Sequence, residues 1–100
     1  MVALDTKLPE ISDACKANGV RRLEIFGSYA RDENGPDSDV DFIVEFADPL
    51  QAGLFDRYLA LHNALQSILG CQVDLIECSA IQNRAIRKRI EEDRRLIYAT

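Results

Sequence analysis

The sequence predicts an α/β fold in which helices pack against a single sheet. Two observations predict it: strand-like stretches alternate with stretches whose apolar residues recur at helical spacing, and glycines or prolines separate them. The predicted order is helix, strand, turn, strand, helix, strand, helix, strand, which is typical of one sheet covered by helices. Because the chain has 100 residues and 47% of them are hydrophobic, we expect one domain over residues 1–100.

The N-terminal part is predicted to form one helix and one strand. Apolar residues at helical spacing predict a helix over 8–18, where Pro9 suits the first turn and Gly19 follows the end. Residues 22–26 are predicted to form a short strand that leads directly into a Gly-Ser turn at 27–28. A glycine in such a turn lets the backbone approach a phosphate closely.

The second strand is predicted over 39–46 and has two unlike faces. It is preceded by a helical turn over 29–33 and by irregular structure over 34–37, where Asn-Gly and a proline exclude a helix or strand. The apolar face carries Val40, Phe42, Val44 and Phe46, and the other face carries Asp39, Asp41, Ile43 and Glu45. One face of this strand therefore begins with two carboxylates.

The strongest helix signal follows a loop over 47–53. Its stripe of apolar positions, at steps of four and three residues, consists of Leu54, Tyr58, Leu61, Leu65 and Ile68. Gly70 is predicted to end this helix, and residues 71–77 are predicted to form the third strand. A helix over 83–93 and a short strand over 96–98 complete the expected order.

Composition excludes several classes of function. The net charge of −5 argues against direct DNA or RNA binding, because phosphate backbones would be repelled. The three cysteines lack zinc-site spacing, so we expect free thiols in a reducing compartment. Apolar runs are too short for a signal peptide or a membrane span, so we expect a cytoplasmic protein. The single histidine, His62, lies in the long helix and is expected to be structural.

Three carboxylates stand out as candidates for chemistry. Asp39 and Asp41 are two residues apart on a strand, so their side chains point to the same side, where a divalent cation would relieve their repulsion. Asp74 lies among apolar residues of the third strand, and it would complete a cluster of three if the two strands were neighbours. Two Mg²⁺ ions held there would support displacement at phosphorus. Taken singly, each of these residues could equally lie on a solvated strand face.

Other phosphate or metal motifs do not fit the acidic run. An EF-hand loop needs glycine at its sixth position, where this chain has Phe42. The sequence contains neither a Gly-Lys-Ser/Thr P-loop nor a GxGxxG motif.

The combined pattern resembles a known superfamily. Gly27-Ser28, ten intervening residues and Asp39-x-Asp41 resemble the G-S-x10-D-x-D motif of DNA polymerase beta-like nucleotidyltransferases. The runs 27–31 and 38–41 look like the minimal nucleotidyltransferase family of bacteria and archaea, and the resemblance covers nearly the whole chain. It implies a mixed sheet with helices on one side.

The resemblance also implies a reaction and its residues: AMP, or another nucleoside monophosphate, moves from ATP or another triphosphate to an acceptor hydroxyl. The implied nucleotide-binding residues are Gly27, Ser28 and Arg31, and the implied metal ligands and catalytic residues are Asp39, Asp41 and Asp74. Mg²⁺ is the implied cofactor, as two ions, and Asp74 would also activate the acceptor. Family members usually have glycine where this chain has Asp32, which puts the rate and nucleotide affinity in question.

The resemblance further implies a protein partner. Members are often antitoxins that adenylylate a tyrosine of a HEPN toxin, with which this chain could form an oligomer. The alternative is a weak or inactive binding module that neutralises its partner by complex formation. Transfer to a small molecule is less favoured, because the chain has no extra domain to hold one. The basic cluster at 84–89 is compatible with a solvated helix or with a partner contact.

Overall fold

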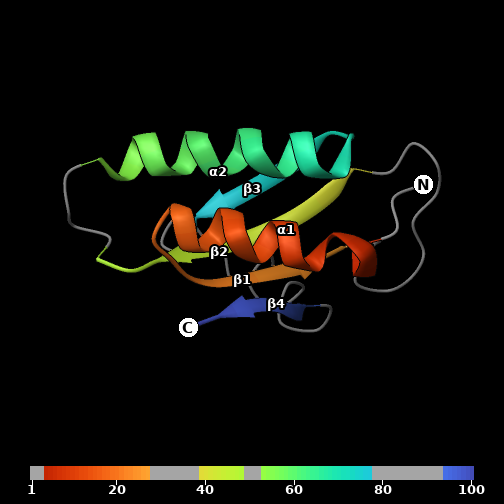
Figure 1. Cartoon of the computed structure of the whole chain (residues 1–100), viewed down its shortest axis with the longest axis horizontal. Coiled ribbons are helices and arrows are strands. Elements are labelled where there is room, and N and C mark those ends of the chain that lie inside the picture. The colour runs from red at the N-terminus through yellow and green to blue at the C-terminus, as the bar shows by residue number, and fades with distance from the viewer. Residues whose placement is uncertain (1–3, 28–38, 49–52, 78–93) are drawn as a thin grey trace.

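A computed structural model describes residues 4–27, 39–48, 53–77 and 94–100 of the chain (Figure 1). The elements are α1 (Leu4–Ala17), β1 (Val20–Phe26), β2 (Val40–Phe46), α2 (Leu54–Leu69), β3 (Val73–Glu77) and β4 (Arg95–Ala99). Among the described residues, no helix is long and apolar enough to cross a membrane. The helical turn expected at 29–33, the irregular segment at 34–37 and the helix expected at 83–93 lie outside the described residues.

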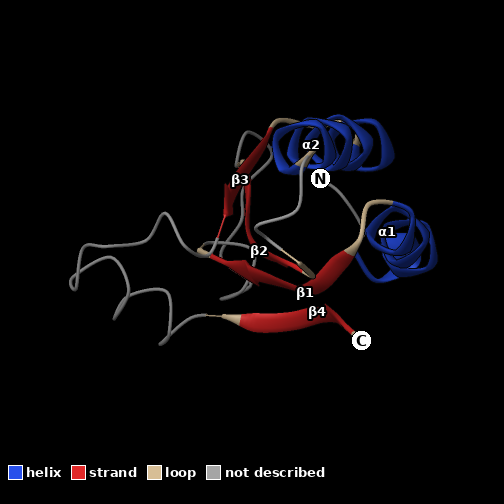
Figure 2. Cartoon of the chain, turned by 90° about the vertical axis from the view of Figure 1, so that its left-hand side faces the viewer, coloured by secondary structure: helices blue, strands red, loops and turns tan. Residues whose placement is uncertain are grey.

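The four strands form one mixed sheet in the order β3-β2-β1-β4. β1 is antiparallel to both β2 and β4, whereas β2 and β3 are parallel and are joined through α2. Both helices lie on the same side of this curved sheet (Figure 2). The predicted α/β class and the mixed sheet that the family resemblance implied are therefore confirmed, and the two helices within the described residues lie on one side, as the resemblance also implied.

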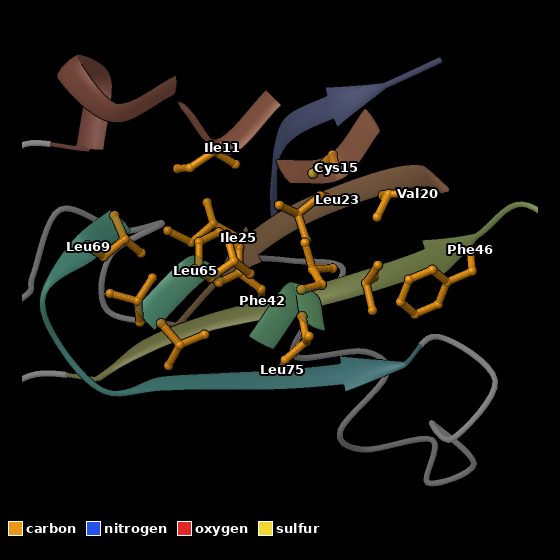
Figure 3. Close-up of a cluster of buried hydrophobic side chains, with 14 residues drawn as sticks. Ile11, Cys15, Val20, Leu23, Ile25, Phe42, Phe46, Leu65, Leu69 and Leu75 are labelled. Carbon is orange, nitrogen blue, oxygen red and sulfur yellow. The ribbon is translucent and has the colours of Figure 1, made fainter. Parts of the chain in front are cut away.

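The core lies between the sheet and the two helices. Figure 3 shows these buried side chains, which come from α1, α2 and all strands except β4. They are Ile11, Cys15, Val20, Leu23, Ile25, Val40, Phe42, Val44, Phe46, Leu61, Leu65, Leu69, Val73 and Leu75. The four apolar positions predicted on one face of the second strand are all among them, so that alternation is confirmed.

The first helix begins four residues before the predicted start, and the placement of Pro9 in a first turn was wrong. Leu4 packs partly buried against the core, and Asp5 provides an acidic side chain in the first turn. Both features favour the extra turn, since apolar burial stabilises it and a negative charge suits a helix N-terminus. Pro9 lies inside the helix and leaves one backbone hydrogen bond unmade.

The second helix and the strand after it are separated by a short left-handed turn. Gly70 has φ 66°, a conformation that side chains with a Cβ disfavour, and its N–H donates to the carbonyl of Gln66. The following strand therefore starts at Val73, two residues later than the predicted 71.

A buried carboxylate on β1 connects that strand to the start of β4. Glu24 is only 6% exposed, and its two oxygens meet Arg22 Nε at 2.7 Å and Arg94 Nε at 3.2 Å. A buried charge is costly unless it is paired, and here two guanidinium groups compensate it. This ion-pair group holds the beginning of the C-terminal strand against the sheet.

Candidate active site

The candidate site lies on the sheet face that points away from the helices, at the end where β2 and β3 begin. The apolar face of β2 packs toward the helices, so the alternation of the strand points Asp41 to the opposite face. In the parallel register of β2 and β3, Asp41 is the direct partner of Asp74. The structure therefore brings these two predicted residues together from strands that lie side by side in Figure 1.

The carboxyl groups of Asp41 and Asp74 are in direct contact. Burial, a side-chain hydrogen bond with Asp74 and the negative charges of Asp74 and Asp39 raise the pKa of Asp41 to about 6. Each of these causes favours the neutral form of Asp41, which donates its proton to Asp74. Asp39 precedes β2 and is exposed, and it acts on Asp41 through its charge.

Gly27 lies next to Asp41 on the side of β1, opposite to Asp74. β1 is antiparallel to β2, and its last residue, Phe26, is the partner of Asp41, so the glycine after it comes next to this carboxylate. Gly27 has φ 75°, and a Cβ at this position would lie 2.5 Å from Asp41 Oδ2. Backbone conformation and lack of space therefore both require glycine here.

The donor atoms at this site suit a hard cation. Mg²⁺ prefers oxygen ligands and binds through one or two carboxylates together with phosphate oxygens. The pairing of Asp41 with Asp74 fits such an ion, and glycine at position 27 lets the Asp41 carboxylate lie directly against the turn. Within the described part of the chain, no group of three or more potential ligands is arranged to hold a metal as it stands. The contact with Asp74 raises the pKa of Asp41, and a cation between the two carboxylates would relieve their repulsion.

Two of the predicted nucleotide-binding residues, Ser28 and Arg31, lie outside the described residues, as does Asp32. One neighbour of the site was not predicted from sequence. The thiol of Cys71 has a raised pKa because it is partly buried and because the charge of Asp39 is close to it. The backbone bond from Val40 N–H to the carbonyl of Gln72, at 3.1 Å, explains this proximity, since it joins the starts of β2 and β3.

The fold and the paired carboxylates beside a glycine turn define an enzyme of the nucleotidyltransferase class, and comparison with known proteins agrees. The family model described as nucleotidyltransferase domain matches residues 8–97. MJ1379 of Methanocaldococcus jannaschii, provisionally named a protein adenylyltransferase, is 47% identical over 79 residues, which are 79% of this chain and 76% of that protein. This chain belongs to the nucleotidyltransferase domain family.

Solved structures give the same fold. A minimal nucleotidyltransferase, itself provisionally assigned, superimposes with a TM-score of 0.76 at 26% identity and covers 92% of this chain and 90% of its own. A complex of a tri-AMPylated HEPN toxin from Shewanella oneidensis with an MNT antitoxin contains a chain that matches with a TM-score of 0.65. That match has 20% identity over 96% of this chain and 72% of the other, so it shows a similarity of fold only.

Proposed function

We propose that this chain transfers AMP from ATP to a hydroxyl group of another protein, with Mg²⁺ held by Asp39, Asp41 and Asp74. The observation that carries the proposal is the parallel register that makes Asp41 and Asp74 direct partners with their carboxyl groups in contact. Two touching carboxyls destabilise a folded chain, and a site for divalent cations is a physical reason to keep them. The provisional name of MJ1379 supports the choice of AMP and of a protein acceptor.

In the proposed reaction the acceptor oxygen attacks the α-phosphorus of ATP and the bond to the β-phosphate oxygen breaks, so that pyrophosphate leaves. When bound, Mg²⁺ supplies charge neutralisation for the phosphates and for the leaving pyrophosphate. Asp74 accepts the proton of the attacking hydroxyl, a role for which its exposure suits it, since an acceptor must reach it from solution. Gly27, Ser28 and Arg31 bind the triphosphate, as the family resemblance implies, and the backbone of Gly27 lies directly against the Asp41 carboxylate.

We further propose that the acceptor is a tyrosine of a HEPN toxin and that the chain acts as its antitoxin. The solved complex of a tri-AMPylated HEPN toxin with an MNT antitoxin supports this choice of acceptor. A tyrosine hydroxyl on the surface of a second protein is also an acceptor that a small catalytic domain can bind. The family resemblance implies that the HEPN toxin is a ribonuclease, and the bulk and negative charge of an attached AMP would oppose its binding of RNA.

The test uses ATP labelled at different phosphates. The protein is incubated with Mg²⁺ and each purified HEPN protein of its own source cell, with the label placed either on the α- or on the γ-phosphate. We expect label on the HEPN protein from α-labelled ATP only, because AMP carries the α-phosphate. Label from γ-labelled ATP would indicate phosphorylation, and no label on any HEPN protein would exclude the proposed acceptor.

The binding-module alternative is separated by Asp41→Asn. This variant keeps the shape of the side chain, so a protein that acts only by complex formation would neutralise the toxin as well as wild type does. We expect instead that Asp41→Asn loses both labelling and protection of cells that express the toxin. Full protection without labelling would favour the binding module.

A further inference from the structure

A row of polar side chains on α2 meets the outer edge of β3. Tyr58, His62 and Gln66 are spaced by four residues and therefore lie along one side of the helix. The Tyr58 hydroxyl donates to the carbonyl of Leu75, and His62 Nε2 lies 2.8 Å from the carbonyl oxygen of Val73. The N–H of Val73 donates to Gln66 Oε1 at 3.4 Å. β3 is at one edge among the described strands, and side chains of the helix bind backbone groups at this edge that no described strand pairs.

The spacing of the helix matches the spacing of the strand. Four residues of helix rise by about 6 Å, and two residues of strand extend by about 6.6 Å. Tyr58 and His62 can therefore reach two carbonyls that are two residues apart, as observed at Leu75 and Val73. Their rings are also parallel, with centroids 6.4 Å apart and an interplanar angle of 2°, so each ring restrains the other. A shift of β3 by one residue would turn both carbonyls away from the helix.

Asp74 lies between the two carbonyls that α2 holds. The carbonyl of Gln72 points toward β2, where it accepts from Val40 N–H at 3.1 Å. Because successive carbonyls of a strand alternate in direction, those of Val73 and Leu75 point outward to α2, and the backbone of Asp74 faces β2. Side chains of α2 therefore fix the position of Asp74 through the two residues next to it in the chain, Val73 and Leu75.

The hydrogen bond from His62 has a defined direction. A backbone carbonyl only accepts, so the hydrogen must be on Nε2 of His62, whether the ring is neutral or charged. A glutamine side chain ends in an N–H donor at comparable reach, whereas leucine has none. Substitutions at this position can therefore separate the hydrogen bond from the packing of the ring.

We propose that Tyr58 and His62 are positioning residues for Asp74: through the carbonyls of Leu75 and Val73 they fix β3 in the register that places the Asp74 carboxyl against Asp41. The inference rests on the proposed role of Asp74 in transfer. It assigns to α2 a part in the reaction although neither side chain touches the substrate. A small displacement of a reacting group is enough to slow catalysis strongly.

The principal test is Tyr58→Phe, which removes one hydroxyl and keeps the ring. The kinetics of AMP transfer from Mg²⁺-ATP to the HEPN acceptor protein are measured, together with backbone amide exchange in the protein without nucleotide. We expect kcat to fall by about 10- to 100-fold with an unchanged KM for ATP, and exchange of the Asp74 amide to become faster. Tyr98→Phe is the matched control, because Tyr98 lies on β4, is partly buried against the same core and loses the same atom. It should leave kcat and the Asp74 amide unchanged.

Two substitutions of His62 test whether its hydrogen bond to the carbonyl of Val73 is required for a normal kcat. His62→Leu should lower kcat as Tyr58→Phe does, and His62→Gln should restore most of it through its own N–H donor. Wild-type kcat and unchanged amide exchange in both Tyr58→Phe and His62→Leu would overturn the inference while leaving the role of Asp74 intact. Full turnover in Asp74→Ala would overturn that role, and the inference with it.

Discussion

Asp41 is the residue on which most of the site depends. It is partly buried, its carboxyl touches Asp74, and the charge of Asp39 acts on it as well. A chain selected for stability alone would not retain this combination, because each of these features disfavours the charged carboxylate. Functional sites are where such locally unfavourable arrangements are retained.

At the scale of a single residue, the prediction concerns Gly27, which lies beside Asp41. Gly27→Ala forces a Cβ into a left-handed conformation, φ 75°, and places it 2.5 Å from Asp41 Oδ2. The backbone strain costs about 1–2 kcal/mol, and the displacement of Asp41 adds to it. We expect the melting temperature in thermal unfolding to fall by roughly 5–15 °C, and AMP transfer to be lost.

Gly70→Ala is the control for this substitution. Gly70 has a similar φ of 66°, but an added Cβ would meet no atom within 4 Å. It should share the backbone cost and keep transfer activity. If the two variants lost stability equally and both remained active, the close contact between position 27 and Asp41 would not contribute to function.

At the scale of elements, patterns that follow general rules were predictable, and contacts that depend on the particular packing of this chain were not. The faces of β2 and the paired placement of Asp41 and Asp74 could be predicted, because strand alternation and the neighbouring of strands through a crossover helix are general rules. The start of α1 at Leu4 was missed, since it depends on contact with a core that the sequence does not display. The same reason applies to the pairing of Glu24 with Arg94, which are far apart in the chain.

The packing of α1 on the sheet predicts how the stability of the fold depends on pH. Cys15 on this helix is fully buried, and burial raises the pKa of its thiol from 9.0 to about 12. Between these values the unfolded chain has released the proton and the folded chain has kept it, so stability falls as pH rises. From pH 9 to pH 10.5 this group removes about 1.5 kcal/mol from the free energy of unfolding.

The measurement is urea unfolding of wild type and Cys15→Ala at both pH values. The variant is less stable at every pH because it leaves a small cavity in the core. Its stability should nevertheless decline less between the two values, by about the 1.5 kcal/mol that the thiol contributes. Equal declines in the two proteins would mean that the thiol can ionise without leaving the core.

At the scale of the whole molecule, one side of the sheet carries the core and the other carries the candidate site. Both helices cover the first side and bury the core (Figure 2). The second side receives Asp41 and Asp74 at the end where β2 and β3 begin and β1 ends, so three strands converge on the site. A ligand that joins these strands should therefore stabilise the fold as a unit.

Mg²⁺ and a nucleotide are expected to act together on this unit. A ligand that binds only the folded state at 100 times its Kd stabilises it by about 2.7 kcal/mol, which for a domain of this size corresponds to a rise of roughly 10–20 °C in melting temperature. We expect this rise with Mg²⁺ and the non-hydrolysable analogue AMP-PNP together, and a much smaller one with either alone, because the carboxylates would otherwise repel the phosphates. Asp41→Asn should stay folded and lose the rise. The same rise in Asp41→Asn as in wild type would remove Asp41 from the metal site, since the metal and the triphosphate would then be held without its charge.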